Sequence, residues 1–260
     1  MFKAAAALIT AILTAMATGC FGPLDPTNPP PARTENSDDT SHTTTSTHAP
    51  GLIAWWTCND SSTTRLKDSL GKFNGQISGC TVDSGIEGAG LRFSGSGSSI
   101  GVYPPTGDSS FDFNAGDFTV SLWVKPMLVG GTDDTMNIIA RGETNKTGFV
   151  LTIIEKRFTV FLGEQKKATL SEDDPLEYGV FQHIVLTRHQ GEVIFFVNSK
   201  ETISFTSTES IHFDGPVPLF IGRDNSNSSN NNFNGLIDEI KLLDMAWGIA
   251  EVDNEYKRFR

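Results

Sequence analysis

The sequence is short of basic residues. Across 260 residues, 20 Lys and Arg stand against 31 Asp and Glu, which gives a formal net charge of -11 at pH 7 and an isoelectric point near 4.8. A nucleic-acid-binding surface requires a basic stripe, and electrostatic docking to anionic lipid requires positive charge. The composition therefore argues against both partners. An acidic surface instead suits solubility or the binding of cations.

Long helical patterns are also nearly absent, and from residue 51 onward short apolar runs alternate with Gly, Asn, Asp and Ser. The clearest run is DFTVSLWVKP at 117–126. Its alternate residues from Phe118 to Val124 are apolar, which is the period of a strand with one face in a core. Trp123 has the opposite parity, so we expect the second face to be half covered and the strand to lie mid-sheet.

Many strands with hairpin-length connections predict an antiparallel sandwich or barrel. No internal repeat is visible, and Met245–Arg260 is the only plausible helix. We expect the first strand, within Leu52–Cys58, to pair near the last strand, within Leu236–Leu242.

The first fifty residues have a different composition. Residues 1–19 combine the basic Lys3 with an apolar run of signal-peptide length, which is too short to span a bilayer. They lead into ATGC, which resembles a bacterial lipobox with Cys20 as the lipid attachment site; ordinary signal-peptide cleavage is the alternative. Residues 20–50 are rich in Pro, Ser and Thr without a recurring apolar residue, which predicts a disordered tether. Since two or more acyl chains anchor stably, we expect an exported protein, lipid-anchored to the bacterial outer membrane or cell surface.

Six segments of the remaining chain occur in the order expected of a known family. They are AWWTCND (54–60), GLRFSG (90–95), DFTVSLWVKP (117–126), FQHIVLTRHQGEVIFFVNSKE (181–201), PLFIGRD (218–224) and FNGLIDEIKLLD (233–244). Together they resemble a laminin-G-like domain of the concanavalin A-like lectin and glucanase superfamily, over Leu52–Glu255. The resemblance implies a two-sheet antiparallel jelly-roll sandwich at 51–260 with a short C-terminal helix.

Motifs for catalysis are weak. Glycosidases of this superfamily use paired carboxylates on one strand face, but Asp238 and Glu239 are adjacent and should point to opposite faces. Gly97–Gly101 fits the G-x-S-x-G pattern of serine hydrolases, yet the prolines that follow cannot begin the helix that this motif requires. His183 has no assignable Ser or Cys nucleophile, and we interpret it as a hydrogen-bonded core or turn residue. We therefore predict a non-catalytic domain.

Two cysteines remain once Cys20 is assigned to lipid. Cys58 and Cys80 form an even pair in a domain predicted to be exported, which favours a disulfide. Closing a loop of about twenty residues would stabilise the fold by roughly 3 kcal/mol. Two buried free thiols are the alternative.

The resemblance also implies one structural calcium ion, because many relatives hold calcium between the loop after the first strand and the last strand. Asp68 and Asp238 are the matching candidates here, and Asn74 is the next ligand to test. Calcium takes six to eight hard oxygen ligands, which turns rich in Asp, Asn and Gly can supply. The alternative is that Asp68 caps the turn Asp68–Gly71.

Aromatic rings are the usual platforms for sugars, and the Asn- and Ser-rich segment Asp224–Asn232 could bind hydroxyl groups. Core packing is the alternative for each tryptophan: Trp55, Trp56, Trp123 and Trp247. We predict a surface-exposed binding module for carbohydrate or another extracellular ligand such as a surface protein, with its binding residues unassigned. The alternatives are a structural envelope protein and, less favoured, a glycan-cleaving enzyme.

Overall fold

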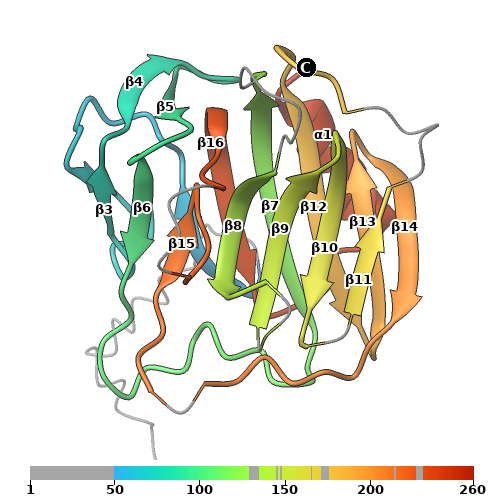
Figure 1. The fold of residues 1–260 in the computed structure, drawn as a ribbon. Coiled ribbons are helices and arrows are strands. Elements are labelled where there is room, and N and C mark those ends of the chain that lie inside the picture. The colour runs from blue at the N-terminus through green and yellow to red at the C-terminus, as the bar shows by residue number, and fades with distance from the viewer. Residues whose placement is uncertain are drawn as a thin grey trace, which may run out of the picture. The chain divides into compact units, whose positions relative to one another are not determined.

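The structure is a computed structural model that describes residues 50–128, 135–144, 146, 148–164, 166–170, 176–213, 215–226 and 231–260. The predicted signal peptide, Cys20 and the tether up to residue 49 lie outside these residues. Two eight-stranded sheets face each other, and sheet B lies in front of sheet A in Figure 1. A two-sheet antiparallel sandwich was the predicted fold, and it is confirmed.

Sheet A contains the strand around which the sandwich is organised. Its order is β14 (Lys200–Thr206), β13 (Glu192–Val197), β12 (Gln182–His189), β7 (Phe118–Pro126), β16 (Asn234–Leu243), β5 (Ala89–Ser94) and β4 (Thr81–Ser84), with β1 (Leu52–Trp56) also paired to β16. β7 lies mid-sheet, between β12 and β16, as its two apolar faces predicted.

Sheet B is formed by the segments of the chain that lie between the strands of sheet A. Its order is β11 (Lys166–Thr169), β10 (Arg157–Leu162), β9 (Gly148–Ile154), β8 (Met136–Gly142), β15 (Leu219–Ile221), β6 (Ser99–Val102), β3 (Gly75–Ser78) and β2 (Arg65–Leu66). All strand pairs are antiparallel. The inward residues of both sheets form one large core, to which β7 contributes its alternate side chains from Phe118 to Val124.

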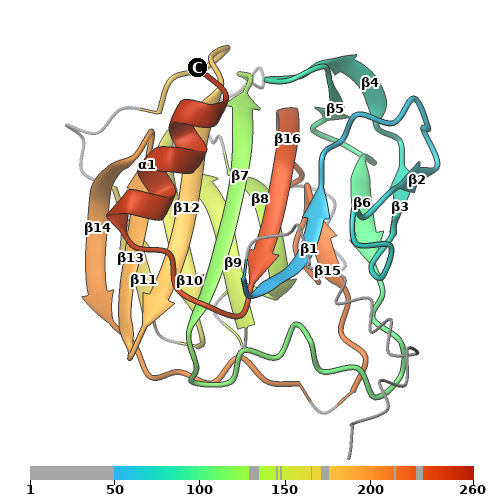
Figure 2. The same ribbon diagram turned by 180° about the vertical axis from the view of Figure 1, so that it is seen from behind.

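The C-terminal helix α1 (Ile249–Arg258) packs on the outer face of sheet A, in front of β12 and beside β7 in Figure 2. The ring of Trp123 stacks on that of Tyr256, with centroids 5.6 Å apart, and Trp123 is fully buried. Glu251 accepts a hydrogen bond from the backbone N–H of Gly248 at the helix start. Lys257 and Arg258 in the last turn complement the helix dipole. No helix within the described ranges is long and apolar enough to cross a membrane.

β16 changes partner halfway along its length. Its first half, 234–237, pairs with β5, and its second half, 240–243, pairs with β1. Between them the register against β7 shifts, and Glu239 adopts a positive φ of 49°. The pairing of the first strand with the last is the one that was predicted. The bulge places Asp238 at the gap between β5 and β1.

Candidate functional site

Asp68 is a buried turn residue whose carboxylate is fully used by the backbone. Its Oδ1 accepts hydrogen bonds from the N–H groups of Trp55 and Leu70 at 3.0 and 3.1 Å. Its Oδ2 accepts from those of Lys72 and Phe73 at 3.0 and 2.9 Å. A carboxylate offers about four lone-pair sites, so Asp68 ties its own turn to β1 and has no acceptor site left.

Asp238 holds a different turn. Its Oδ2 accepts from the backbone N–H groups of Ile86 and Glu87 at 2.9 and 3.3 Å, and its Oδ1 accepts from that of Glu239 at 2.8 Å. Burial raises the pKa of Asp238 to about 7, and the neighbouring carboxylate of Glu239 adds to this effect. Glu239 instead accepts from Nε1–H of Trp55 at 2.7 Å. The two adjacent carboxylates therefore serve separate partners.

These contacts do not fit a calcium ion shared by Asp68 and Asp238. Asn74 uses its Oδ1 to accept from the N–H of Asp68 at 3.1 Å, so it too is engaged within the turn. Among the described residues, no group of three or more His, Cys, Asp and Glu side chains is placed to hold a metal. The hydrogen bonds favour the turn alternative for Asp68. A chelation experiment tests calcium binding directly.

The predicted disulfide between Cys58 and Cys80 is not formed, and this prediction is corrected: both are buried free thiols. The Sγ of Cys58 lies 3.8 Å from the carbonyl oxygen of Trp56, and that of Cys80 lies 3.6 Å from that of Ser78. The Sγ of Cys80 also lies 3.8 Å from the carbonyl oxygen of Ser99 in β6. Both thiols therefore contact backbone carbonyls, which residue spacing alone could not reveal. Burial raises the pKa of Cys80 to about 12 and that of Cys58 well above its usual value, so neither is a thiolate nucleophile.

No tryptophan offers an open platform. Trp56 and Trp123 are fully buried, and Trp247 packs beneath α1. Trp55 contacts both Lys241 and Arg258, whose charged groups are 4.8 and 5.2 Å from its ring centroid. Packing therefore explains all four.

Ser121 and His183 form a contact that the sequence did not suggest. Ser121 Oγ lies 2.9 Å from His183 Nε2 across β7 and β12, and both side chains are buried. Burial, assisted by Lys241, lowers the pKa of His183 to about 3. The ring stacks on Trp123 and Tyr256. A weakly basic imidazole that is buried against these two rings is part of the scaffold and not an accessible general base.

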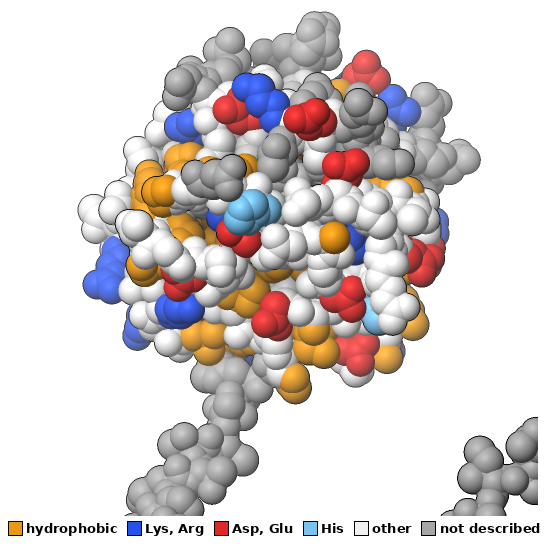
Figure 3. All heavy atoms as spheres, turned by 90° about the horizontal axis from the view of Figure 1, so that it is seen from below, with side chains coloured by type: hydrophobic (Ala, Val, Ile, Leu, Met, Phe, Trp, Pro, Cys, Tyr) orange, Lys and Arg blue, Asp and Glu red, His pale blue; other side chains and the backbone are white. Residues whose placement is uncertain are grey.

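A hollow of about 400 Å³ lies at the end of the sandwich where Phe213, Pro216 and Val217 gather. In the view of this end, apolar side chains lie among acidic and basic ones (Figure 3). The polar groups around it are used internally. Arg141 forms a buried ion pair with Asp112.

The segment Asp224–Asn232, predicted as a hydroxyl-binding loop, borders the same hollow. Asn225 Oδ1 accepts from the N–H of Gly142, and its Nδ2 donates to the carbonyl of Pro218. Asp224 accepts from Ser226. Residues 227–230 of the segment lie outside the described residues. The described polar groups thus hold the loop itself.

An exposed aromatic ring lies instead on the outer face of sheet B, toward its β2 edge. Tyr103 directly follows β6 and is 54% exposed. Its ring lies against the backbone of Gly101, where an added Cβ would come within 2.7 Å of the ring atoms. Phe220 of β15 meets this ring edge-on, with centroids 6.2 Å apart. The guanidinium of Arg223 in turn packs 4.5 Å from the Phe220 centroid. The sheet thus supports Tyr103 while leaving much of its ring in solvent.

The edge strands place polar side chains in line with this ring. β2 and β3 pair Arg65 with Gln76, and β3 and β6 pair Gln76 with Gly101. Arg65 and Gln76 are exposed, and they share a transverse row with the glycine that supports Tyr103. This part of sheet B can be followed at β3, β6 and β15 in Figure 1.

Lys67 and Asn74 continue the same outward side. Residues two apart in a strand share a face, so Lys67 follows Arg65, while Leu66 between them is buried in the core. Asn74 precedes the paired Gly75 and shares the face of Gln76. We call these six side chains the Tyr103 face: Arg65, Lys67, Asn74, Gln76, Tyr103 and Phe220.

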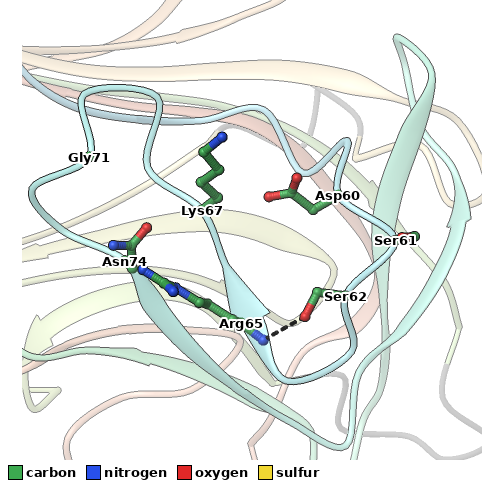
Figure 4. Close-up of a pocket in the computed structure, with 7 residues that line it drawn as sticks. All are labelled: Asp60, Ser61, Ser62, Arg65, Lys67, Gly71 and Asn74. Atoms are coloured by element: carbon green, nitrogen blue, oxygen red, sulfur yellow. Dashed lines mark hydrogen bonds between the residues drawn. The ribbon is translucent and has the colours of Figure 1, made fainter.

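A hollow of about 400 Å³ opens at this edge, and Figure 4 shows its lining. The lining residues are Asp60, Ser61, Ser62, Arg65, Lys67, Gly71 and Asn74. The hydrogen bond drawn there joins the backbone N–H of Arg65 to Ser62 Oγ at 3.0 Å. Within the described part of the chain, the charged groups of Asp60, Arg65 and Lys67 have no hydrogen bond or ion pair. These groups are free to bind a ligand.

The sequence analysis did not identify this face because it considered only the tryptophans as aromatic platforms. The available signal was alternation: Arg65-Leu66-Lys67 and Gly101-Val102-Tyr103 each place a buried apolar residue between two outward positions. That signal shows which side chains point outward. It does not show that β2, β3, β6 and β15 lie side by side.

The architecture agrees with the comparison to known families. The family model described as the concanavalin A-like lectin/glucanases superfamily matches residues 96–253, more than half of the chain. The chain belongs to this superfamily. Among curated proteins none matches this member at a significant level.

Solved structures with the same fold include proteins of several kinds. The binding domain of paraclostridial mosquitocidal protein 1 aligns with a TM-score of 0.66 and 17% identity, over 80% of this chain and 52% of that one. Domain 4 of an extracellular arabinanase from Geobacillus stearothermophilus, solved with arabinotriose, aligns with a TM-score of 0.58 and 18% identity, over 80% and 98%. The sialidase of Trypanosoma rangeli aligns with a TM-score of 0.61 and 15% identity, over 79% and 32%. This superfamily member therefore spans about half of the toxin domain and a third of the sialidase.

Proposed function

We propose that this protein is a non-catalytic binding module that holds a saccharide at the Tyr103 face. The observation that carries the proposal is the exposed ring of Tyr103, backed by Gly101, with the exposed side chains of Gln76 and Arg65 on the next two strands of the same face. A flat ring can stack on the C–H face of a sugar and remove apolar surface from water. Convergent polar groups beside it would then bind the hydroxyls and fix the orientation.

The similar structures support a binding role. Two of them are a toxin's binding domain and an arabinanase domain solved with arabinotriose. Glycosidases and a sialidase share the fold, so the fold alone does not separate binding from catalysis. The non-catalytic proposal rests on the side chains: Asp238 and Glu239 hold separate structural partners, and His183 is sealed beneath α1.

We further propose that the module is exported and lipid-anchored through Cys20, on the bacterial outer membrane or cell surface. The support is the lipobox-like ATGC that follows an apolar segment of signal-peptide length. Cells fed a fatty-acid analogue should label the wild-type protein and not Cys20→Ala. Equal labelling of both would end this part of the proposal.

A glycan array tests the binding role. The purified wild-type protein should retain a defined set of glycans, Tyr103→Ala should lose that set, and Tyr103→Phe should keep most of it because the ring remains. Ile249→Ala removes an exposed apolar side chain from α1, on the other sheet, and should bind like wild type. Identical binding by Tyr103→Ala and wild type would refute the site. If the wild type binds no glycan, a structural or protein-binding envelope role becomes the better account.

A further inference from the structure

We propose that the saccharide held at the Tyr103 face carries a carboxylate or sulfate group, which Arg65 and Lys67 bind. This inference rests on the proposed function and specifies its ligand class. It begins from the charge of the protein. In a chain of formal charge -11, Arg65 and Lys67 form no ion pair with a described residue, and with only one carboxylate in the same hollow, that of Asp60, they leave a local excess of positive charge.

Four other solvent-accessible basic side chains are neutralised by nearby carboxylates. The pairs are Lys72–Asp108, Lys146–Glu143, Arg157–Glu155 and Lys257–Asp253. Arg65 and Lys67 have no such partner among the described residues. Among the described residues, Lys156, Arg258 and Arg260 are exposed and lack such a partner as well, so an unpaired cation alone does not mark a site. Arg65 and Lys67 differ because they line a hollow at the β2 edge, on the same outer face as the exposed ring of Tyr103 and two strands from it.

The spacing of the strands puts both cations within reach of a sugar stacked on Tyr103. Neighbouring strands lie about 4.8 Å apart, so β2 lies roughly 10 Å from β6 with β3 between them. A saccharide stacked on Tyr103 and extending over β3 would bring its substituents within reach of the long side chains of Arg65 and Lys67. The ligand thus needs no rearrangement of the sheet.

Each side chain then has a chemical role. The planar guanidinium of Arg65 suits the two oxygens of a carboxylate or sulfate, and Lys67 supplies a point charge. Asp60, the one carboxylate in the lining, can accept hydrogen bonds from sugar hydroxyls. Asn74 keeps its Nδ2 as a donor because its Oδ1 is engaged by Asp68. A neutral sugar would use the ring and the amides but would leave both cations without a partner.

The test compares oligosaccharides of one backbone that differ in a single group: neutral, carboxylate-bearing and sulfate-bearing. Isothermal titration of the wild-type protein should show the acidic ligands binding tighter by on the order of tenfold, as expected for one charge-assisted hydrogen bond. Added salt should reduce the difference in affinity between the acidic and the neutral ligands, because it screens the charges. The two acidic ligands show whether carboxylate or sulfate geometry is preferred, and either preference supports the proposal.

Two double variants of equal net charge provide the control. Arg65→Gln with Lys67→Gln should lower acidic-ligand affinity to that of the neutral ligand. Lys156→Gln with Lys257→Gln removes the same charge elsewhere and should leave the preference intact. If both doubles weaken acidic binding alike, or if neutral and acidic ligands bind equally, the anion inference is overturned. In either case, loss of all binding in Tyr103→Ala would still support the saccharide site. Retention of binding in that variant would instead refute the proposed function itself.

Discussion

The outer faces of the two sheets both carry aromatic and cationic side chains, which are packed and paired on sheet A but exposed and, within the described residues, without an ion pair on the Tyr103 face of sheet B. On sheet A, Trp55 contacts both Lys241 and Arg258 and donates its N–H to Glu239. On sheet B, Tyr103 is half exposed, and Arg65, two strands away on the same face, has no ion-pair partner within the described chain. The aromatic and cationic groups on the outer face of sheet A contact one another and helix α1. On the outer face of sheet B they remain available, and availability distinguishes a binding surface from a scaffold.

Helix α1 produces the difference. It covers Trp123 with the ring of Tyr256, and Glu255 forms a buried ion pair with Lys241 of β16. Without this cover, the outer face of sheet A would itself present stacked aromatic rings. No helix within the described ranges covers the Tyr103 face. Substitutions at four residues distinguish side chains that stabilise the fold from side chains that bind a ligand. They are given from the largest expected effect on stability to the smallest.

Removal of Trp123 should cause the largest loss of stability. Trp123→Ala leaves a cavity between β7 and α1, and truncating a fully buried tryptophan costs about 3–5 kcal/mol. Denaturant unfolding followed by circular dichroism measures this loss. A change below about 1 kcal/mol would show that α1 is not firmly packed on sheet A, and the contrast between the faces would fail.

Asp68→Ala should come next, with a loss of about 2–4 kcal/mol, because four backbone N–H groups lose their acceptor. Asp68→Asn keeps one acceptor oxygen and should lose less. Equal stability of Asp68→Ala and wild type in denaturant unfolding would show that these hydrogen bonds contribute nothing.

Thermal melts in EDTA and in millimolar calcium separate this turn role from the calcium prediction. With Asp68 saturated by N–H donors, the wild-type curves should superimpose. Each kcal/mol of unfolding free energy shifts the melting midpoint of a domain of this size by roughly 2–4 °C. A bound calcium ion would therefore raise the midpoint by several degrees. Such a shift, abolished in Asp68→Ala or Asp238→Ala, would establish the metal site.

Asp238 should make stability depend on pH. Its folded pKa, raised to about 7 by burial, exceeds the unfolded value near 3.9, so the folded state retains a proton that the unfolded state releases. The contribution of Asp238 is therefore fully present below about pH 4 and is lost as pH rises through about 7. The expected loss is on the order of 1 kcal/mol or more.

His183 acts in the opposite direction, because its pKa, lowered by burial to about 3, makes stability fall as pH drops below about 6.5. The two effects overlap, so the informative quantity is the difference in unfolding free energy between wild type and Asp238→Asn. That difference should decrease from pH 4 to pH 7. A flat difference would mean that Asp238 titrates normally.

Local patterns predicted the elements of this fold but not their lateral contacts. The alternation from Phe118 to Val124 predicted a strand with one face in the core. Trp123 on the opposite parity predicted a mid-sheet strand with a half-covered second face, whereas that face is almost fully buried because α1 packs on it. The pairing of Leu52–Trp56 with the end of β16 was expected as well. These features depend on periodicity that a linear sequence displays directly.

The site required information that spacing does not contain. Arg65, Gln76, Gly101 and Phe220 meet only because four strands far apart in sequence pair in one register. The disulfide prediction was wrong for the same reason, since the spacing of Cys58 and Cys80 does not fix the direction of their thiols. Similarly, Asp68 was a candidate ligand by residue type, whereas its hydrogen bonds make it a turn residue.

The most direct test of the contrast between the faces is Tyr103→Ala, measured for stability and for binding on the same sample. Tyr103 contributes little to the core, so its loss should change the unfolding free energy by less than about 1 kcal/mol. Titration with an acidic oligosaccharide retained by the wild type should show affinity reduced on the order of tenfold or more. Unchanged affinity, or a loss of affinity accompanied by unfolding, would contradict the account that sheet B binds through a side chain that the fold does not need.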